Sequence, residues 1–326
     1  YEVANALAFH HSDYITVAYA DEGITLRKKG IELPIMVVNA ESDGLAAVLQ
    51  YRLEPEIYSF RMLDLLREQL RTLPETASVS IHIKLDTGMH RLGFEAADLP
   101  RLMAVLTEEP RLHVRSIFTH LATADDPDMD VYTRAQLERF DRMSGVLKAG
   151  LPYGDTVLRH ALNTAGICRF PEYQYDMVRL GIGLYGVGVT AEMEGQLETV
   201  STFKTTIAQI RTIAAGEAVG YGRRFIAEKP MRIGVICVGY ADGLNRRLSQ
   251  GVGRVWIKGK TAPIIGNICM DMSMLDLTDV DAAEGDDVIL FGKDWPVTRM
   301  ADALGTIPYE VLTGISPRVK RIYYQA

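Results

Sequence analysis

A single arginine in an apolar segment marks the first place where this chain could bind an anion. Arg179 lies in the run Met-Val-Arg-Leu-Gly-Ile-Gly of residues 177–183. Glycines lack a Cβ atom, so the backbone amides of this run could approach an anion closely. A guanidinium within an apolar strand also needs a polar or charged partner. We interpret the run as a candidate phosphate-binding segment; the alternative is a simple tight turn.

The run His-Ala-Leu-Asn-Thr-Ala-Gly of residues 160–166 is a second candidate anion site. It is predicted to end a strand and begin a helix, and the amides at the start of a helix attract anions. The hydroxyl and amide of Thr164 could therefore bind an anion. The alternative for Thr164 is an ordinary N-cap. His160, taken alone, is more simply a hydrogen-bonded structural histidine than a catalyst.

Two cations and a histidine follow other predicted strands. Lys84 ends one strand, and Arg91 lies seven residues later in the loop after it. His120 ends another strand and begins the run His-Leu-Ala-Thr-Ala-Asp. In a barrel of parallel strands, sites form at the carboxyl ends of the strands. We therefore interpret Lys84, Arg91 and His120 as candidate site residues. Two cations so close would repel each other, so the alternative for Lys84 and Arg91 is that both are solvated on a loop.

Composition limits the function classes. The 326 residues, 48% of them hydrophobic, suffice for one large core and a second smaller one. Lys and Arg number 35 against 42 Asp and Glu, a net charge of −7, which argues against binding to nucleic acid. We therefore expect small molecules, or a second copy of the chain, as partners.

The cysteines and the apolar runs indicate the compartment. The three cysteines Cys168, Cys237 and Cys269 have no CxxC spacing, which favours buried thiols in a reducing cytosol over disulfides. No apolar run approaches the roughly 20 residues that span a bilayer, and the chain opens without a signal-peptide pattern. We expect a soluble, cytoplasmic protein with no metal, and a segment upstream because the chain opens on Tyr1 rather than Met.

The first half of the chain alternates short β-branched runs with amphipathic helical runs, which is typical of parallel βα units. Helices are predicted at 61–73, 99–107 and 132–148. Seven strands are predicted, at 15–18, 34–38, 57–60, 80–85, 114–121, 157–163 and 177–183. Residues 1–10 read as a helix that comes before the first of these strands. A helix in first place implies one earlier strand, so we predict a (β/α)8 barrel whose first strand is missing from this chain.

After about residue 195 the pattern changes to strands punctuated by Gly, Asp and Asn. Strands are predicted at 203–210, 233–238, 254–257, 264–269, 274–277 and 288–291. The sequence therefore predicts an α/β barrel domain at 1–195 and a mainly β domain at 196–326.

Two tyrosines in glycine-containing turns complete a pattern that resembles alanine racemase. Tyr221 lies in Val-Gly-Tyr-Gly, and Tyr240, 19 residues later, lies in Val-Gly-Tyr-Ala-Asp-Gly. They follow the runs 84–91 and 119–125 and precede Tyr309, in an order and spacing that carry the resemblance. The resemblance implies a pyridoxal phosphate (PLP) cofactor, held as a Schiff base on a lysine whose motif would precede Tyr1. We therefore expect this chain by itself to form no such bond and to be inactive.

The resemblance also implies roles for the site residues. Arg179 would donate to the pyridine nitrogen of PLP, with His160 supporting it. Carbamylated Lys84 would support Arg91, which contacts cofactor and substrate. The remaining implied cofactor positions are Asn163, Thr164, Gly181, Ile182 and Tyr309, and the implied substrate positions are Arg91, Met270, Asp271 and Tyr240.

Tyr221 is the base that the resemblance selects, opposite the missing lysine. A free tyrosine has a pKa near 10, so its phenolate needs cationic or hydrogen-bonding neighbours near neutral pH. The resemblance implies His120 and Arg179 as those neighbours. Taken alone, Tyr221 would be an exposed aromatic residue in a glycine turn.

The predicted function is PLP-dependent interconversion of L- and D-alanine, supplying D-alanine for peptidoglycan, by a homodimer with shared sites. One alternative is a serine or broader amino-acid racemase, or an amino-acid decarboxylase. Another is a PLP-binding, non-catalytic module. The chain could also be part of a longer fusion with a cell-wall ligase domain.

Overall fold

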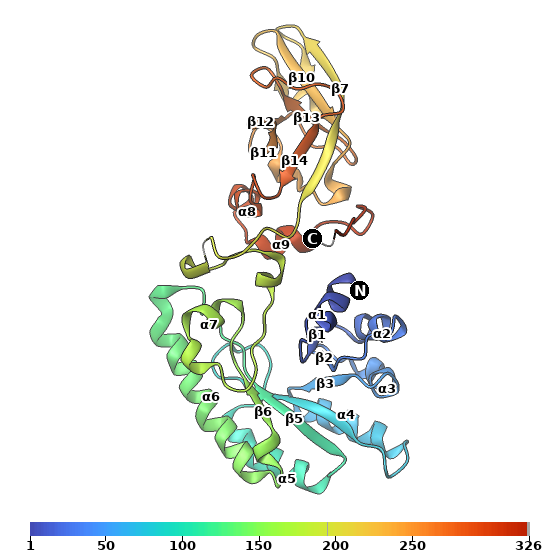
Figure 1. Cartoon of the computed structure of the whole chain (residues 1–326), viewed down its shortest axis with the longest axis vertical. Helices are drawn as coiled ribbons and strands as arrows, with labels where there is room; N and C mark the ends of the chain where they lie inside the picture. The colour runs from blue at the N-terminus through green and yellow to red at the C-terminus, as the bar shows by residue number, and fades with distance from the viewer. Residues whose placement is uncertain (194, 325–326) are drawn as a thin grey trace. The chain divides into compact units, whose positions relative to one another are not determined.

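The computed structural model describes residues 1–193 and 195–324. The chain divides into two compact units (Figure 1). The first comprises Tyr1–Gly181 and Val189–Met193, and the second comprises Ile182–Gly188 and the chain after Met193.

The first unit is built on a parallel sheet of six strands whose order in space follows the chain, β1 to β6 (Figure 1). The strands are β1 (Ile15–Val17), β2 (Ile35–Val37), β3 (Glu54–Ile57), β4 (Val79–Lys84), β5 (Leu112–Phe118) and β6 (Leu158–His160). The helices are α1 (Glu2–Phe9), α2 (Ala20–Lys28), α3 (Leu45–Gln50), α4 (Phe60–Arg71), α5 (Leu99–Glu108), α6 (Asp130–Gly150) and α7 (Thr164–Arg169). The predicted α/β class is confirmed.

The two faces of the sheet carry different residues. In β4, Ile81 and Ile83 are fully buried in the apolar core, while His82 and Lys84 lie on the opposite face because successive side chains of a strand alternate. The apolar face packs on helices such as α4, which buries Met62, Leu63, Leu66 and Leu70. Each such side chain contributes about 1.5–3 kcal/mol through burial. The polar face is the one on which the candidate site forms.

Two predicted strands are wrong. Residues 177–183 form no strand: the amide of Arg159, which a ladder would use, donates to Asp176 Oδ2 at 2.8 Å, and a 3₁₀ helix begins at Ile182. The strand expected at 57–60 instead ends at Ile57, because Ser59 caps α4 through a hydrogen bond from the Met62 amide at 3.3 Å. The strand expected before α1 is tested by no described residue and stays a prediction.

The second unit contains a closed antiparallel barrel with the strand order β10-β13-β12-β11-β14-β7. Its strands are β7 (Phe203–Ile213), β10 (Met231–Ile236), β11 (Arg254–Ile257), β12 (Lys260–Ile265), β13 (Ser273–Asp276) and β14 (Asp287–Phe291). The mainly β character is confirmed. The strand expected at 264–269 is displaced, since β12 ends at Ile265 and Gly266 has a φ of 63°. The sequence reading missed the pair β8 (Ala218–Val219) and β9 (Phe225–Ile226) and the helices α8 (Val297–Leu304) and α9 (Pro308–Thr313).

The cysteines and helices bear on the expected compartment. All three cysteines are free, but none is buried: Cys237 is exposed, and Cys168 and Cys269 are partly exposed, so the expectation of buried thiols is wrong. Among the described helices, none has both the length and the apolar character needed to cross a membrane.

Candidate functional site

The polar face of the first unit gathers candidate residues at the carboxyl ends of three neighbouring strands. Lys84 ends β4, Phe118 ends β5 and His160 ends β6, and the register pairs Lys84 with Phe118 and Phe118 with His160. The Phe118 ring stacks on the His160 imidazole at a centroid distance of 4.9 Å. Residues far apart in sequence thus meet at one edge of the sheet, as expected for parallel strands.

Arg179 is held at this edge by four hydrogen bonds. Its Nη1 donates to His160 Nδ1 at 2.6 Å and to the His160 carbonyl at 3.2 Å. Its Nη2 donates to the carbonyls of Thr119 at 2.7 Å and Ala161 at 2.9 Å. Desolvation lowers the pKa of Arg179 to about 10, opposed by the Glu56 carboxylate. The guanidinium therefore stays charged near neutral pH and can only donate hydrogen bonds.

The predicted phosphate segment meets the start of α7. The Gly181 amide donates to Thr164 Oγ1 at 2.9 Å, and Thr164 is buried. The N-cap of α7 is Asn163, whose side chain accepts from the Gly166 amide at 3.0 Å. The alternative reading of Thr164 as the N-cap is therefore wrong. Ile182 is buried at the start of the 3₁₀ helix Ile182–Tyr185, which belongs to the second unit.

Lys84 is buried rather than solvated. Its Nζ lies 3.0 Å from Glu56 Oε1, and the Glu56 side chain is completely buried. Burial raises the pKa of Glu56, while the cations Lys84, Arg179 and Arg91 oppose the shift. Arg91 itself is exposed in the loop after β4. The alternative of two solvated cations is thus wrong for Lys84. Glu56 was not recognised in the sequence because one carboxylate in the run Glu-Pro-Glu-Ile carries no distinguishing signal.

His120 follows β5 in a predominantly buried position. Desolvation lowers its pKa to about 3, and the cations Arg179, Arg91 and Lys84 add to the shift. His120 is therefore neutral near pH 7. It can serve a phenolate as a hydrogen-bonding neighbour, but not as the cationic one that the sequence reading also allowed.

The second unit presents its candidates on turns. Tyr221, in a 3₁₀ turn with Gly220 at a φ of 71°, is 74% exposed. Its carbonyl accepts from Asn267 Nδ2 at 2.9 Å. Tyr309 is a partly exposed residue of α9 whose carbonyl accepts from Thr313 Oγ1 at 2.8 Å.

Tyr240, Met270 and Asp271 lie together. The Tyr240 amide donates to the Cys269 carbonyl at 3.0 Å. Gly239 allows this approach, since a Cβ atom there would lie 2.3 Å from the Cys269 and Met270 carbonyl oxygens. Asp271 accepts from Arg318 Nη2 at 2.6 Å, a partner that the sequence reading missed.

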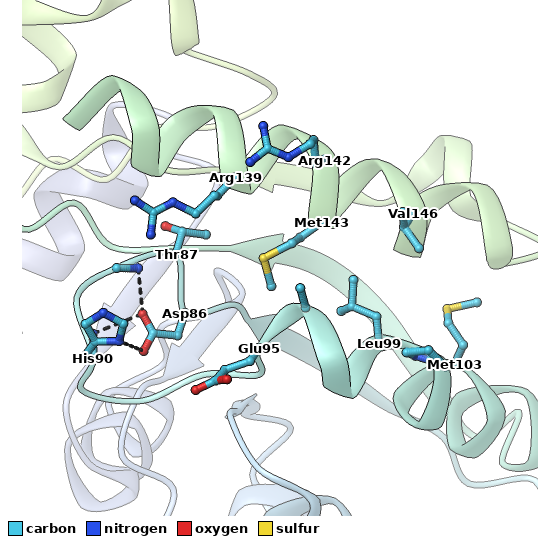
Figure 2. A pocket seen from close by; sticks show the side chains of 13 residues that line it. Asp86, Thr87, His90, Glu95, Leu99, Met103, Arg139, Arg142, Met143 and Val146 are labelled. Atoms are coloured by element: carbon cyan, nitrogen blue, oxygen red, sulfur yellow. Dashed lines mark hydrogen bonds and ion pairs between the residues drawn. The ribbon is translucent and has the colours of Figure 1, made fainter. Parts of the chain in front are cut away.

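A pocket of about 540 Å³ lies elsewhere, between α5, α6 and the loop after β4 (Figure 2). Figure 2 shows Arg139, Arg142 and Met143 of α6 facing it, with His90 and Asp86 at one end. None of the predicted site residues lines this pocket. Size therefore does not identify the candidate site here; the convergence of Arg179, His160, His120 and Lys84 does.

Comparisons with known proteins agree with this arrangement. Residues 1–189 match the family described as alanine racemase, N-terminal domain, and residues 200–323 match alanine racemase, C-terminal domain. The alanine racemase of Carboxydothermus hydrogenoformans is 37% identical over 332 residues, covering 99% of this chain and 88% of the relative.

Solved structures give the same answer. Alanine racemase of Clostridium difficile 630 superposes with a TM-score of 0.91 at 32% identity, covering 99% of this chain and 84% of that one. Alanine racemase of Bartonella henselae with covalently bound pyridoxal phosphate gives 0.88 at 30% identity, covering 99% and 88%. The chain therefore belongs to the alanine racemase family.

Proposed function

We propose that this protein interconverts L- and D-alanine with the help of PLP. The observation that carries the proposal is the set of donors on the polar face of the first unit, in a chain whose two units both match the family. Arg179 can only donate, and Thr164, Asn163 and the Gly181 amide lie at the start of α7 beside it. This donor set fits a ligand with an acceptor nitrogen and a phosphate.

Each residue has a distinct part in holding the cofactor. Thr164 and the amides of Gly181 and Ile182, with Asn163 and Tyr309, would hold the phosphate, and Arg179 would donate to the ring nitrogen. PLP, when bound, withdraws electrons from the substrate's α-carbon and so makes its hydrogen more acidic. Because the pKa of Arg179 is about 10, its guanidinium would donate a hydrogen bond to the ring nitrogen without transferring the proton. The ring nitrogen would therefore stay unprotonated. A ring with an unprotonated nitrogen would withdraw electrons from the substrate's α-carbon only in part, which favours return of the proton to that carbon over side reactions.

The second unit would supply proton transfer and substrate contacts. Tyr221 would take or return the α-hydrogen on one face of the substrate, with neutral His120 hydrogen-bonding to its phenolic oxygen. Backbone groups at Met270 and Asp271, together with Arg91 of the first unit, would meet the alanine carboxylate, and Tyr240 would line the entrance. The lysine base expected upstream of Tyr1 stays a prediction that no finding supports.

The proposed function is tested by incubating the protein with PLP and L-alanine and following the loss of optical activity. Formation of racemic alanine is expected from the protein that carries the lysine, and L-serine in parallel tests the broader-racemase alternative. Borohydride reduction and peptide mapping of this chain with PLP should give no modified lysine, and a stoichiometric pyridoxyl-lysine at one position such as Lys84 would overturn the placement of the lysine upstream of Tyr1. PLP binding without racemisation of any amino acid would favour the non-catalytic alternative.

Carbamylation of Lys84 stays a prediction, and Glu56 sets a condition on it. A carbamate would carry negative charge beside a completely buried carboxylate that now pairs with Lys84 at 3.0 Å. We therefore expect the modification only with Glu56 protonated. Carbon-13 NMR of protein equilibrated with ¹³C-bicarbonate tests this: the carbamate signal should be stronger in Glu56→Gln, which has no carboxylate beside Lys84, than in the native protein.

We also propose a homodimer, located in the cytoplasm, in which the second unit of one subunit completes the first-unit site of the other. The supporting observation is that Arg179 belongs to one unit and Tyr221 to the other. Mixing Arg179→Ala with Tyr221→Phe, both in the full-length protein that carries the lysine and each nearly inactive, should restore activity, since some heterodimers would contain one intact site. No restoration despite demonstrated subunit exchange would contradict shared sites. The proposed boundary between the domains is at 195/196.

A further inference from the structure

An unbroken chain of hydrogen bonds leads from Arg179 across the polar face of the sheet. Arg179 Nη1 contacts His160 Nδ1 at 2.6 Å, and His160 Nε2 contacts Ser116 Oγ at 2.8 Å. Ser116 Oγ contacts His82 Nδ1 at 2.6 Å, and His82 Nε2 contacts Glu54 Oε2 at 2.8 Å. Four consecutive strands, β3 to β6, thus contribute one residue each. The sequence reading found only the first two members of the chain.

The middle of this chain is sealed from water. His82, Ser116 and His160 are each 0% exposed. The Glu54 side chain is 16% exposed, so solvent reaches only the far end. Buried polar groups must satisfy one another, and each interior group here therefore depends on its two neighbours in the chain.

The two ends determine the direction of every bond between them. Arg179 can only donate, and an ionised carboxylate can only accept. His160 Nδ1 must therefore be unprotonated, and the His160 Nε2–H group donates to Ser116. The Ser116 hydroxyl donates to the unprotonated Nδ1 of His82, and the His82 Nε2–H group donates to Glu54. Both histidines are then neutral, with the proton on Nε2.

Other protonation states break a bond. A proton on His160 Nδ1 would face the Arg179 donor at 2.6 Å. A proton on His82 Nδ1 would make Ser116 an acceptor from both rings and leave its own buried hydroxyl proton without an acceptor. Burial, then the Arg179 charge, lowers the pKa of His160 well below its ordinary value, in agreement with the neutral form.

The far end is supported by two further donors. Tyr14 donates to the same Glu54 oxygen at 3.1 Å, and Arg115 Nε donates to the Tyr14 hydroxyl at 3.0 Å. Burial, then the Glu54 charge, raises the pKa of Tyr14 to about 12, so Tyr14 remains a donor. Glu54 Oε2 thus accepts from Tyr14 as well as from His82 Nε2, as the direction of the chain requires.

We propose that Glu54, His82 and Ser116 are positioning residues. They hold His160 in the neutral tautomer with an unprotonated Nδ1, and this tautomer orients the guanidinium of Arg179 toward the cofactor. The part of this inference that concerns the cofactor rests on the proposed function. The part that concerns the histidine protons does not.

The protons are observed directly by NMR of the full chain with ¹⁵N-labelled histidine, of which there are seven. Signals are assigned with His82→Gln and His160→Gln. His160 and His82 should both show an unprotonated Nδ1 and a protonated Nε2. A proton on Nδ1 of His160, or a doubly protonated ring at neutral pH, would overturn the proposal.

A matched pair of variants tests the role of Glu54. Glu54→Gln keeps an acceptor oxygen and should preserve the His160 proton on Nε2. Glu54→Leu removes the acceptor at similar volume and should give a mixture of His160 forms, with kcat lowered by about 10-fold, the scale of one lost buried hydrogen bond. Identical His160 spectra for the two variants would overturn the proposal.

Ser116→Ala provides a second route if Glu54→Leu does not fold. The His160 Nε2 proton should shift and exchange faster with solvent, because its acceptor is gone. Ser144→Ala, which removes another buried hydroxyl outside the chain of bonds, should leave that signal unchanged. An unshifted His160 signal in Ser116→Ala would contradict the proposal. The expected histidine protons in a protein that carries the lysine but has no racemase activity would refute the proposed function and leave standing the part of this inference that concerns the histidine protons.

Discussion

The candidate residues of the two units differ in burial and in the contacts that they make within their own unit. In the first unit, Arg179, His160 and Lys84 have defined partners, and His120 and Glu56 have shifted pKa values caused by burial. In the second unit, the side chains of Tyr221, Tyr240 and Met270 are 74%, 44% and 53% exposed. Buried polar groups must be satisfied within their own unit. Exposed groups gain a special environment only from another surface.

This difference predicts two kinds of variant. Changes on the polar face of the first unit should affect stability and activity together. Changes on the turns of the second unit should affect activity while leaving stability unchanged.

Arg179→Ala should have the largest effect. It leaves buried His160 Nδ1 and the carbonyls of Thr119 and Ala161 without their donor, at a cost of about 1–3 kcal/mol for each group that water cannot reach. In the protein that carries the lysine, we also expect racemase kcat to fall by about 10³-fold or more, the scale of one lost electrostatic donor. Urea unfolding and racemisation assays measure the two effects. Arg134→Ala, an exposed arginine paired with Glu172, is the control and should change neither.

Tyr221→Phe should affect only activity. The enantiomers have equal free energy, so overall kcat/KM must fall equally in both directions, and exchange of the α-hydrogen with deuterated solvent is the informative measurement. Exchange from L-alanine should fall by about 10²–10⁴-fold, the range of a lost general base, while exchange with retention from D-alanine persists. The free energy of unfolding should change by less than about 0.5 kcal/mol. Equal loss of exchange from both enantiomers would make Tyr221 a positioning residue.

Glu56→Gln should destabilise the first unit by about 3 kcal/mol, because it leaves the Lys84 ammonium buried without its counter-ion. The double variant Glu56→Leu with Lys84→Met should recover most of this loss, since an apolar pair often replaces a buried ion pair without cost. Glu68→Gln, at an exposed carboxylate of α4, is the control. A Glu56→Gln protein as stable as the native one would show that the pair is not formed in solution.

The smallest expected effect, taken per pH unit, is on the pH dependence of stability. Burial holds the pKa of His120 at about 3 against an ordinary 6.5, so between these values the unfolded chain binds one proton more than the folded chain. The free energy of unfolding should therefore fall on acidification below pH 6.5, by about 1.4 kcal/mol per pH unit for this group. Above pH 6.5 His120 contributes no such slope. His120→Gln should remove this part of the acid slope, whereas His10→Gln, at an exposed position, should not; identical slopes in native protein and His120→Gln would contradict the shifted pKa.

The sequence by itself determined the class of fold and the local elements that position the site. The strand expected at 80–85 is β4 at Val79–Lys84, and the helix expected at 99–107 is α5 at Leu99–Glu108. Such elements are predictable because apolar periodicity and turn residues act over a few neighbouring positions. The requirement of Arg179 for partners is also readable, since an arginine in an apolar run cannot stay unsatisfied.

Only the tertiary structure decided which polar residues face those partners. Glu54, His82 and Ser116 alternate with apolar residues in the same way as the solvent-facing residues of a half-exposed strand, so their pattern alone does not separate burial from exposure. Their burial follows from strands β3 to β6 lying side by side, with residues 28 to 44 positions apart joined by hydrogen bonds. The neutral state of His120 and the pairing of Lys84 with Glu56 have the same origin, because desolvation and charge depend on neighbours in space rather than in sequence.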